Sequence, residues 1–199
     1  MIAFIPPKEK FGAYLFDCDG TLADTMPLHY EAWKQAVIEH GANFDYSVEL
    51  FYSMAGMSVQ DTITRLNEMF KTDLDPNEVG ETKNALYSER LQFVKPIQGV
   101  VDFCLDCLSS TAKVAVVSGS SRKEVEATLE IIGLGGKIET TVCQGETELG
   151  KPHPQPFTYA ANLLSTPYED CLVLEDSAIC IEGVKSEGMS ALFIPNSML

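Results

Sequence analysis

Two aspartates, Asp17 and Asp19, stand two residues apart directly after an apolar stretch. The stretch Tyr14–Phe16 predicts a buried strand, and Gly20 predicts that the chain turns away just beyond the pair. In open α/β sheets, ligands bind beyond the carboxyl ends of the strands. Two carboxylates in one small site repel each other unless a cation or a shared proton lies between them. The pair therefore indicates a site for a hard divalent cation held by oxygen ligands.

A second pair of acids, Glu175 and Asp176, follows another apolar stretch, Leu172–Leu174, near the other end of the chain. This stretch also predicts a strand. If both strands lie in one parallel sheet, their carboxyl ends share an edge. The sequence therefore places acids at the end of two separate strands.

Hydroxyl and basic groups follow the other predicted strands. Ser118 and Gly119 stand between a predicted strand and a predicted helix, where a hydroxyl and backbone N–H groups can bind an anion. The same residues also suit an ordinary capping turn. Lys151 lies between Gly150 and Pro152, so a stiff loop holds a positive charge that suits a phosphate or a carboxylate. Taken alone, this segment also suits a surface turn.

These segments, in this order, resemble the four motifs of the haloacid dehalogenase (HAD) superfamily of phosphohydrolases. They are Asp17–Leu22, Ser118, Gly150–Pro154 and Glu175–Asp176, and the resemblance covers about residues 13–195. It implies that Asp17 is a nucleophile that forms an aspartyl-phosphate. It also implies that Asp19 is the general acid and base. Turn-forming aspartates are the alternative for the first motif alone.

The resemblance implies Mg²⁺ as the cofactor. The expected ligands are Asp17, Asp176 and the backbone carbonyl of Asp19. Glu175 is either a second ligand or a partner that orients the ligands. Capping of the next helix by Asp176 or Ser177 is compatible with metal binding.

Ser118 and Lys151 are expected to act in catalysis and, with Gly119, to bind the phosphoryl group. Arg122 is a further candidate for substrate binding, and a solvated arginine in the first helical turn is its alternative. His29, on the helix that follows the first motif, either faces the substrate or packs within its own helix bundle.

Strands and helices alternate after about residue 96, which predicts a parallel sheet covered by helices on both faces. Strands are expected at 113–117, 140–143, 171–174 and 191–194, and helices at about 99–108, 122–132, 154–164 and before Gly188. Residues 24–95 show helical patterns only, at 26–40, from Ser58 and from Asp75 to about Phe93. We therefore expect a Rossmann-like α/β core of residues 1–23 and 96–199. A small all-helical cap, residues 24–95, is inserted after the first strand.

The composition limits the possible partners. The net charge is −15, with 14 basic and 29 acidic residues, which argues against nucleic-acid binding. No apolar run is long enough to cross a membrane, and the first residues lack a charged leader, so a cytoplasmic protein is expected. The six cysteines are dispersed in apolar runs, which favours buried free thiols. We expect a monomer or a weak dimer.

The sequence thus predicts a Mg²⁺-dependent phosphatase that acts on a small phosphorylated metabolite, a sugar or polyol phosphate. The helical insert resembles the cap of the β-phosphoglucomutase-like branch, and Met54–Asp61 resembles its substrate-specificity loop. That branch places an arginine for a second phosphate where this chain has Val59, which favours a phosphatase over a phosphomutase. A phosphomutase and a non-catalytic binding protein of the same fold remain the alternatives.

Overall fold

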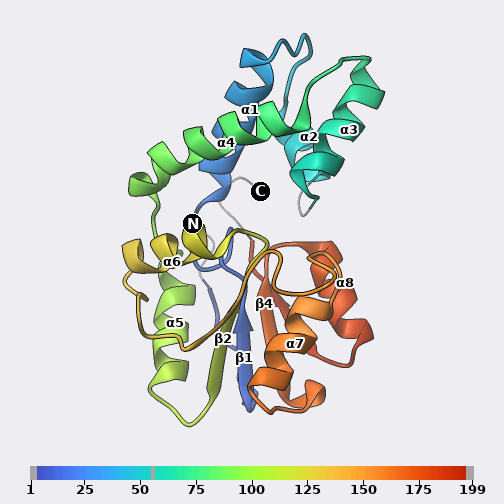
Figure 1. The fold of residues 1–199 in the computed structure, drawn as a ribbon. Coiled ribbons are helices and arrows are strands. Elements are labelled where there is room, and N and C mark those ends of the chain that lie inside the picture. The colour runs from blue at the N-terminus through green and yellow to red at the C-terminus, as the bar shows by residue number, and fades with distance from the viewer. Residues whose placement is uncertain (1–3, 55–56, 196–199) are drawn as a thin grey trace. The chain divides into compact units, whose positions relative to one another are not determined.

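Two compact units make up the chain, of which the computed structural model describes residues 4–54 and 57–195. One unit joins Met1–Met26 to Val94–Leu199, and the other is Pro27–Phe93. The first contains a parallel sheet with helices, and the second is built from helices (Figure 1). Two residues of the expected specificity loop, Ala55 and Gly56, lie outside the described residues.

Five parallel strands form the sheet of the α/β unit, in the order β3-β2-β1-β4-β5. The strands are β1 (Ala13–Phe16), β2 (Lys113–Val117), β3 (Thr140–Val142), β4 (Cys171–Glu175) and β5 (Ser190–Phe193). β1 lies at the centre, and every residue of β1 and β4 is buried, as expected for strands covered on both faces. This sheet confirms the predicted α/β fold.

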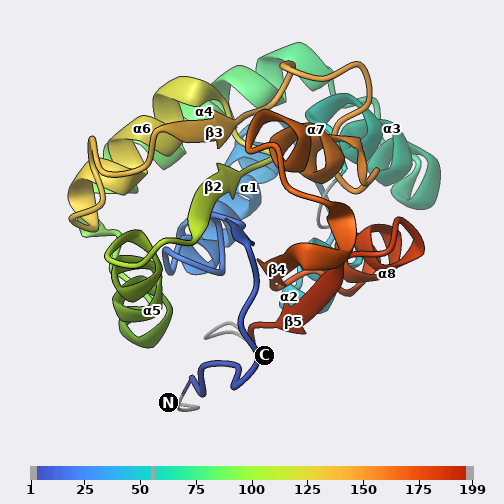
Figure 2. The same cartoon turned by 90° about the horizontal axis from the view of Figure 1, so that it is seen from below.

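Helices cover both faces of the sheet. They are α5 (Gln98–Leu108), α6 (Arg122–Ile131), α7 (Gln155–Leu163) and α8 (Ala178–Ser186), and a 3-10 turn, η2 (Tyr168–Asp170), precedes β4. Figure 2 shows α5 and α6 on one side of the sheet and α7 and α8 on the other. Successive side chains of β1 point to opposite faces of the sheet. Tyr14 and Phe16 pack against Phe103 of α5. Ala13 and Leu15 belong to the apolar core that the sheet forms with α7 and α8.

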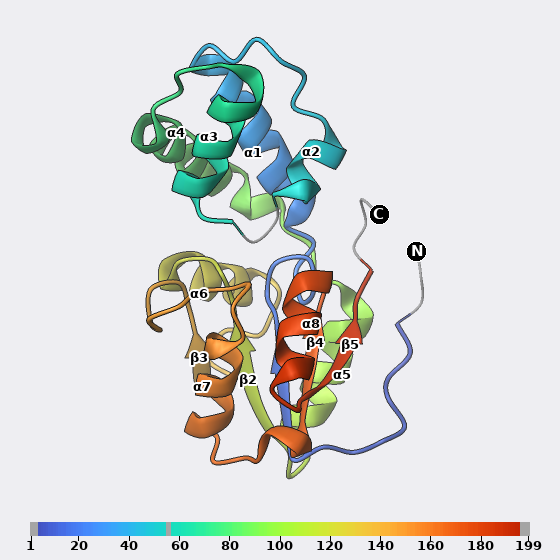
Figure 3. The same cartoon turned by 90° about the vertical axis from the view of Figure 1, so that its right-hand side faces the viewer.

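The helical unit consists of the elements labelled α1 to α4 in Figure 3, together with a short 3-10 turn. Its elements are α1 (Met26–Glu39), α2 (Val48–Ser53), α3 (Val59–Phe70), α4 (Pro76–Arg90) and the 3-10 turn η1 (Leu91–Phe93). Ser58 and Asp75 cap α3 and α4, because their side chains accept hydrogen bonds from backbone N–H groups of the first helical turn. A Cβ at Gly80 would lie 2.9 Å from Val59 Cγ1, so the small residue lets α3 and α4 approach closely.

The register of the sheet brings the ends of several strands to one edge. Phe16 pairs with Val116 and Leu174, and Val117 pairs with Val142. The residues that follow β1, β2 and β4 therefore emerge side by side.

Within the described ranges, no helix has the length and apolar character needed to cross a membrane.

Candidate active site

Backbone hydrogen bonds continue past the strand ends and fix the start of the site. Asp17 N–H donates to the carbonyl of Leu174 at 2.9 Å, and Ser118 N–H donates to the carbonyl of Val142 at 2.9 Å. Asp17, Ser118 and Glu175 are all buried. Because the backbone hydrogen bonds of the sheet extend to Asp17 and Ser118, the side chains at these strand ends are held close together.

Lys151 joins the ends of β1 and β4. Its Nζ lies 2.6 Å from Asp17 Oδ1 and 2.7 Å from Glu175 Oε2, and it also donates to the Val117 carbonyl at 3.3 Å. The side chain is only 7% exposed, and its ammonium lies 5.0 Å from the ring centre of Phe157. A lysine from a loop far along the chain is therefore paired with both buried acids.

The charges in this cluster do not balance. Burial, followed by the charge of Glu175, raises the pKa of Asp17 to about 8, and burial also raises the pKa of Glu175. Burial lowers the pKa of Lys151, but the charges of Asp17 and Glu175 outweigh it and keep that pKa well above its usual value. One lysine thus faces several carboxylates, and a further cation would relieve the repulsion among them.

The oxygen atoms needed for such a cation are present. One carboxylate oxygen from each of Asp17, Glu175 and Asp176 lies within 4.8 Å of the other two. Asp17 Oδ2 is buried and has no hydrogen-bond partner among the described residues. An all-oxygen set with an unused buried oxygen suits Mg²⁺. The residues present therefore fit the expected metal.

Gly20 leaves room for this cluster. Its φ is +84°, and a Cβ at this position would lie 2.2 Å from Asp176 Oδ2. The turn within the first motif therefore needs glycine for its backbone conformation and also for the space that the Asp176 carboxylate occupies.

Three hydroxyl groups hold Asp19. Oδ2 accepts hydrogen bonds from Ser120 Oγ at 2.7 Å and Ser118 Oγ at 3.1 Å, while Oδ1 accepts one from Thr25 Oγ1 at 2.9 Å. Sequence reasoning did not identify Thr25 or Ser120. Ser118 and Gly119 indicated the right loop, but the sequence gave no sign that two hydroxyls of this loop, those of Ser118 and Ser120, converge on Asp19.

The loop after β2 carries the other expected phosphoryl-binding groups. Ser120 N–H donates to Ser118 Oγ at 3.0 Å, so the hydroxyl of Ser118 is fixed from both sides. Gly119 is exposed between these serines, and a Cβ there would meet no atom within 4 Å. A side chain at this position would therefore stand in open space, and the residue is accessible.

Two of the expected substrate-binding residues have described contacts with other side chains. The guanidinium of Arg122 forms a bidentate pair with Glu146, at 2.7 and 2.9 Å, and also binds Thr141. His29 belongs to the helical unit, where its ring stacks on Tyr87 at a centroid distance of 4.0 Å. The described hydrogen bonds of Arg122 thus hold its guanidinium at β3 and the loop after it.

A buried lysine in the helical unit was not singled out from the sequence. Lys83 on α4 is 8% exposed, and its ammonium lies 5.3 Å from the ring centre of Tyr87, the same ring that His29 stacks on. A polar residue in the middle of a helical pattern gives little signal of burial, which is why the sequence did not reveal it.

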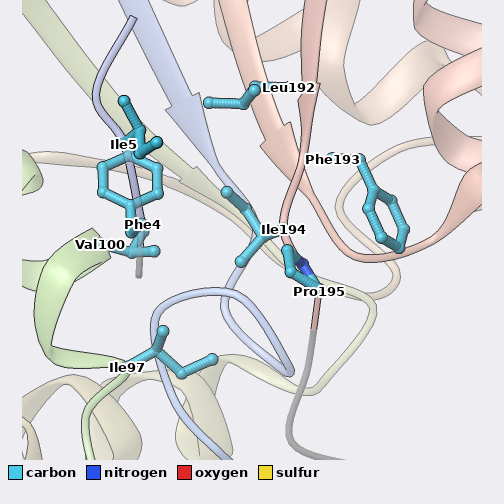
Figure 4. Close-up of a pocket in the computed structure, with 8 residues that line it drawn as sticks. All are labelled: Phe4, Ile5, Ile97, Val100, Leu192, Phe193, Ile194 and Pro195. Atoms are coloured by element: carbon cyan, nitrogen blue, oxygen red, sulfur yellow. The ribbon is translucent and has the colours of Figure 1, made fainter. Parts of the chain in front are cut away.

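A separate apolar pocket lies between the amino-terminal segment, the start of α5 and the end of β5. Figure 4 shows Phe4 and Ile5 of the amino-terminal segment opposite Phe193–Pro195, with Val100 of α5 nearby. Its lining contains only apolar residues and offers no group for acid–base or metal chemistry. The candidate active site is therefore the acidic cluster at the carboxyl edge of the sheet.

Known phosphatases are among the proteins to which this chain is similar. Fructose-1-phosphate phosphatase YqaB of Escherichia coli is 28% identical over 185 residues, which are 92% of this chain and 96% of that protein. A phosphorylated carbohydrates phosphatase of Thermotoga maritima is 26% identical over 185 residues, covering 91% of this chain and 83% of that protein.

The fold is shared with solved structures as well. The crystal structure of CbbY from Rhodobacter sphaeroides has a TM-score of 0.83 at 21% identity, and the match covers 94% of this chain and 87% of that one. The family of haloacid dehalogenase-like hydrolases matches residues 14–194. The chain therefore belongs to the haloacid dehalogenase-like hydrolase family.

Proposed function

We propose that the protein is a Mg²⁺-dependent phosphatase that hydrolyses a small sugar or polyol phosphate through an aspartyl-phosphate on Asp17. Membership of the hydrolase family and the phosphatase relatives support a phosphoric monoester hydrolase. The observation that carries the mechanism is the Asp17 carboxylate. Lys151 Nζ donates a hydrogen bond to Asp17 Oδ1 at 2.6 Å. The other oxygen of Asp17, Oδ2, is buried and has no hydrogen-bond partner among the described residues.

The proposed reaction has two steps. The Asp17 carboxylate attacks phosphorus, the bond from phosphorus to the ester oxygen breaks, and Asp19 gives that oxygen a proton. Asp19 then takes a proton from water, the water oxygen bonds to phosphorus, and the bond to Asp17 breaks. Phosphate leaves and the Asp17 carboxylate is restored.

The surrounding residues orient these groups. The hydroxyls of Thr25, Ser118 and Ser120 hold Asp19, and Lys151 supplies positive charge beside the nucleophile. Ser118, Gly119 and Lys151 are proposed to bind the phosphoryl oxygens.

Asp17, Asp176 and the backbone carbonyl of Asp19 are the proposed metal ligands. Glu175 binds Lys151 at 2.7 Å and accepts a hydrogen bond from Ser177 N–H at 3.0 Å. It is therefore proposed to orient the site from the outer shell. Mg²⁺ there would neutralise the phosphoryl group and the carboxylates.

The substrate class is proposed from the relatives, two of which are named for phosphorylated carbohydrates. We further propose that the helical insert, residues 24–95, is a cap that selects the substrate, with His29 among its contacts. The net charge of −15 gives the chain an overall field that repels anions, so substrate binding is proposed to depend on Lys151, the metal and backbone N–H groups.

A reducing, cytoplasmic location is part of the same proposal. All six cysteines are free and buried. Buried thiols without disulfides are usual in a reducing compartment.

A phosphomutase is less well supported. Val59 begins α3 and packs close to Gly80 of α4, so the position where the related branch places an arginine is an apolar helix contact. A hexose 1-phosphate and its bisphosphate primer should accordingly yield inorganic phosphate. Formation of the hexose 6-phosphate instead would favour the mutase.

The test is hydrolysis of p-nitrophenyl phosphate and a panel of sugar and polyol phosphates by the wild type, Asp17→Asn and a control, Asp102→Asn. Asp102 is an exposed residue of α5 whose carboxylate accepts a hydrogen bond from Gln98. We expect activity that needs Mg²⁺, is lost with EDTA, survives in Asp102→Asn and disappears in Asp17→Asn. Full activity of Asp17→Asn would refute the mechanism, and absence of turnover with retained Mg²⁺ binding would favour a binding protein.

A further inference from the structure

Arg122 is the first residue of α6, but its side chain reaches across to β3 and the loop after it. Nε and Nη2 donate to the two oxygens of Glu146 at 2.7 and 2.9 Å. Nη1 and Nη2 donate to Thr141 Oγ1 and to the Thr141 carbonyl at 2.6 and 3.1 Å. A bidentate pair of this kind fixes direction as well as distance. Arg122 therefore ties the start of α6 to the segment that leaves β3.

Glu146 in turn closes a tight turn at the end of β3. Its Oε2 accepts a hydrogen bond from Cys143 N–H at 3.0 Å, and its own N–H donates to the Cys143 carbonyl at 3.2 Å. Gly145 within the turn has a φ of +80°. The hydrogen bond from Arg122 lowers the pKa of Glu146, so the pair stays charged at neutral pH.

This turn is bound to the loop that holds the proposed acid and base. Gln144 N–H donates to the Ser120 carbonyl at 3.0 Å. The side chain of the same serine donates to Asp19 Oδ2 at 2.7 Å. A continuous series of short contacts thus leads from the Arg122–Glu146 pair, through the turn, to the Asp19 carboxylate.

We propose that Arg122 and Glu146 form a positioning pair, which fixes the turn Cys143–Glu146 and through it sets Ser120 against Asp19. Arg122 then acts through Asp19 and does not bind substrate. The inference rests on the proposed phosphatase function. It assigns to Arg122 a role different from the substrate contact expected from the sequence.

Such a role has a specific kinetic signature. Protonation by a general acid matters most when the leaving oxygen is strongly basic. Loss of Asp19 orientation should therefore impair hydrolysis of an alkyl phosphate more than that of p-nitrophenyl phosphate, whose leaving group needs little help. General loss of folded enzyme would lower both rates by the same factor.

The test compares Arg122→Gln, Glu146→Gln and the double variant with the wild type on glycerol 2-phosphate and p-nitrophenyl phosphate. Glu126→Gln is the matched control. Glu126 also pairs with Arg122, but the distance from Nη1 to Oε1 is 3.5 Å, longer than the bonds to Glu146, and the side chain of Glu126 is 63% exposed. Each single variant should lower kcat/KM about tenfold for glycerol 2-phosphate, a partial loss of acid catalysis. For p-nitrophenyl phosphate we expect a change of about twofold or less, with KM unchanged.

The double variant should lose no more than either single variant, since both remove one unit. Glu126→Gln should match the wild type. Hydrogen exchange gives a readout independent of activity: the amides of Cys143 and Gln144 should exchange faster in Arg122→Gln and Glu146→Gln than in Glu126→Gln.

Two results would overturn the proposal. One is a raised KM in Arg122→Gln with normal kinetics in Glu146→Gln, which is the behaviour of a substrate contact. The other is unchanged amide exchange in both single variants. Inactivity of the wild type on both esters would instead refute the proposed phosphatase, and the exchange rates would still decide whether the pair fixes the turn.

Discussion

Replacing either Asp17 or Lys151 should abolish turnover, but only the replacement of Lys151 should destabilise the metal-free protein. Asp17→Asn removes one charge from a cluster that already has an excess of carboxylates. Lys151→Met removes the lysine that pairs with both buried acids at 2.6 and 2.7 Å. Asp17 and Lys151 form an ion pair with each other. The neighbours of Asp17 include carboxylates of the same charge, whereas Lys151 lies between two carboxylates of opposite charge.

The distances give the magnitudes. Oxygens of Asp17, Glu175 and Asp176 lie within 4.8 Å of one another. At an effective dielectric constant of about 20, each repulsion involving Asp17 is then at least about 3 kcal/mol, and the attraction to Lys151 at 2.6 Å is about 6 kcal/mol. Asp17→Asn removes two repulsions and one attraction that nearly cancel, and it also removes a buried charge. Lys151→Met leaves buried acids without their partner, which costs about 3–5 kcal/mol.

The assay is urea unfolding of the wild type and both variants in EDTA at pH 9, above the pKa of about 8 of Asp17, where its carboxylate is charged. We expect the free energy of unfolding of Asp17→Asn to equal or exceed that of the wild type. We expect Lys151→Met to lose about 3–5 kcal/mol. If Asp17→Asn were destabilised as strongly as Lys151→Met, the idea of an acidic cluster in need of a cation would be wrong.

Three further predictions follow from the same contacts. Burial and the charge of Glu175 raise the pKa of Asp17 from 3.8 to about 8, so its contribution to stability is present below pH 4 and is lost as pH rises to 8. In EDTA, the free energy of unfolding of Asp17→Asn minus that of the wild type should therefore increase between pH 4 and pH 8. A difference that does not change with pH would refute the raised pKa of Asp17. Gly20→Ala should weaken Mg²⁺ binding measured by calorimetry, because its Cβ would meet Asp176 at 2.2 Å. Gly133→Ala, which has a similar φ of +80° and no atom within 4 Å, should bind Mg²⁺ normally. Burial raises the pKa of Cys104 and Cys180 to about 12, so Ellman's reagent should label these thiols only after unfolding, and rapid labelling of the native protein would contradict their burial.

Local patterns predicted the main elements well where a signal lies within a few residues. The strand at 113–117 has the expected bounds, and the capping residues Ser58 and Asp75 begin α3 and α4 as expected. The helix expected to run to about Phe93 ends at Arg90, and the 3-10 turn η1 follows it. α2 was missed because its six residues are too few to show a helical period.

The contacts between distant residues were harder to predict. Motif order indicated Asp17, Lys151 and Asp176, and the structure brings Lys151 to Asp17 across 134 positions of sequence. Nothing in the sequence indicated that Thr25 and Ser120 hold Asp19. Such contacts depend on how loops fold beyond the strand ends, and side-chain hydrogen bonds of this kind leave no periodic pattern.

The most direct test of the central claim is to trap the phosphorylated enzyme. Wild-type protein would be mixed with ³²P-labelled substrate and Mg²⁺, quenched in acid within milliseconds and mapped by peptide digestion. We expect an alkali-labile acyl phosphate on Asp17 that is absent in Asp17→Asn. Label on another residue, or steady turnover with no covalent phosphate at any time, would contradict it.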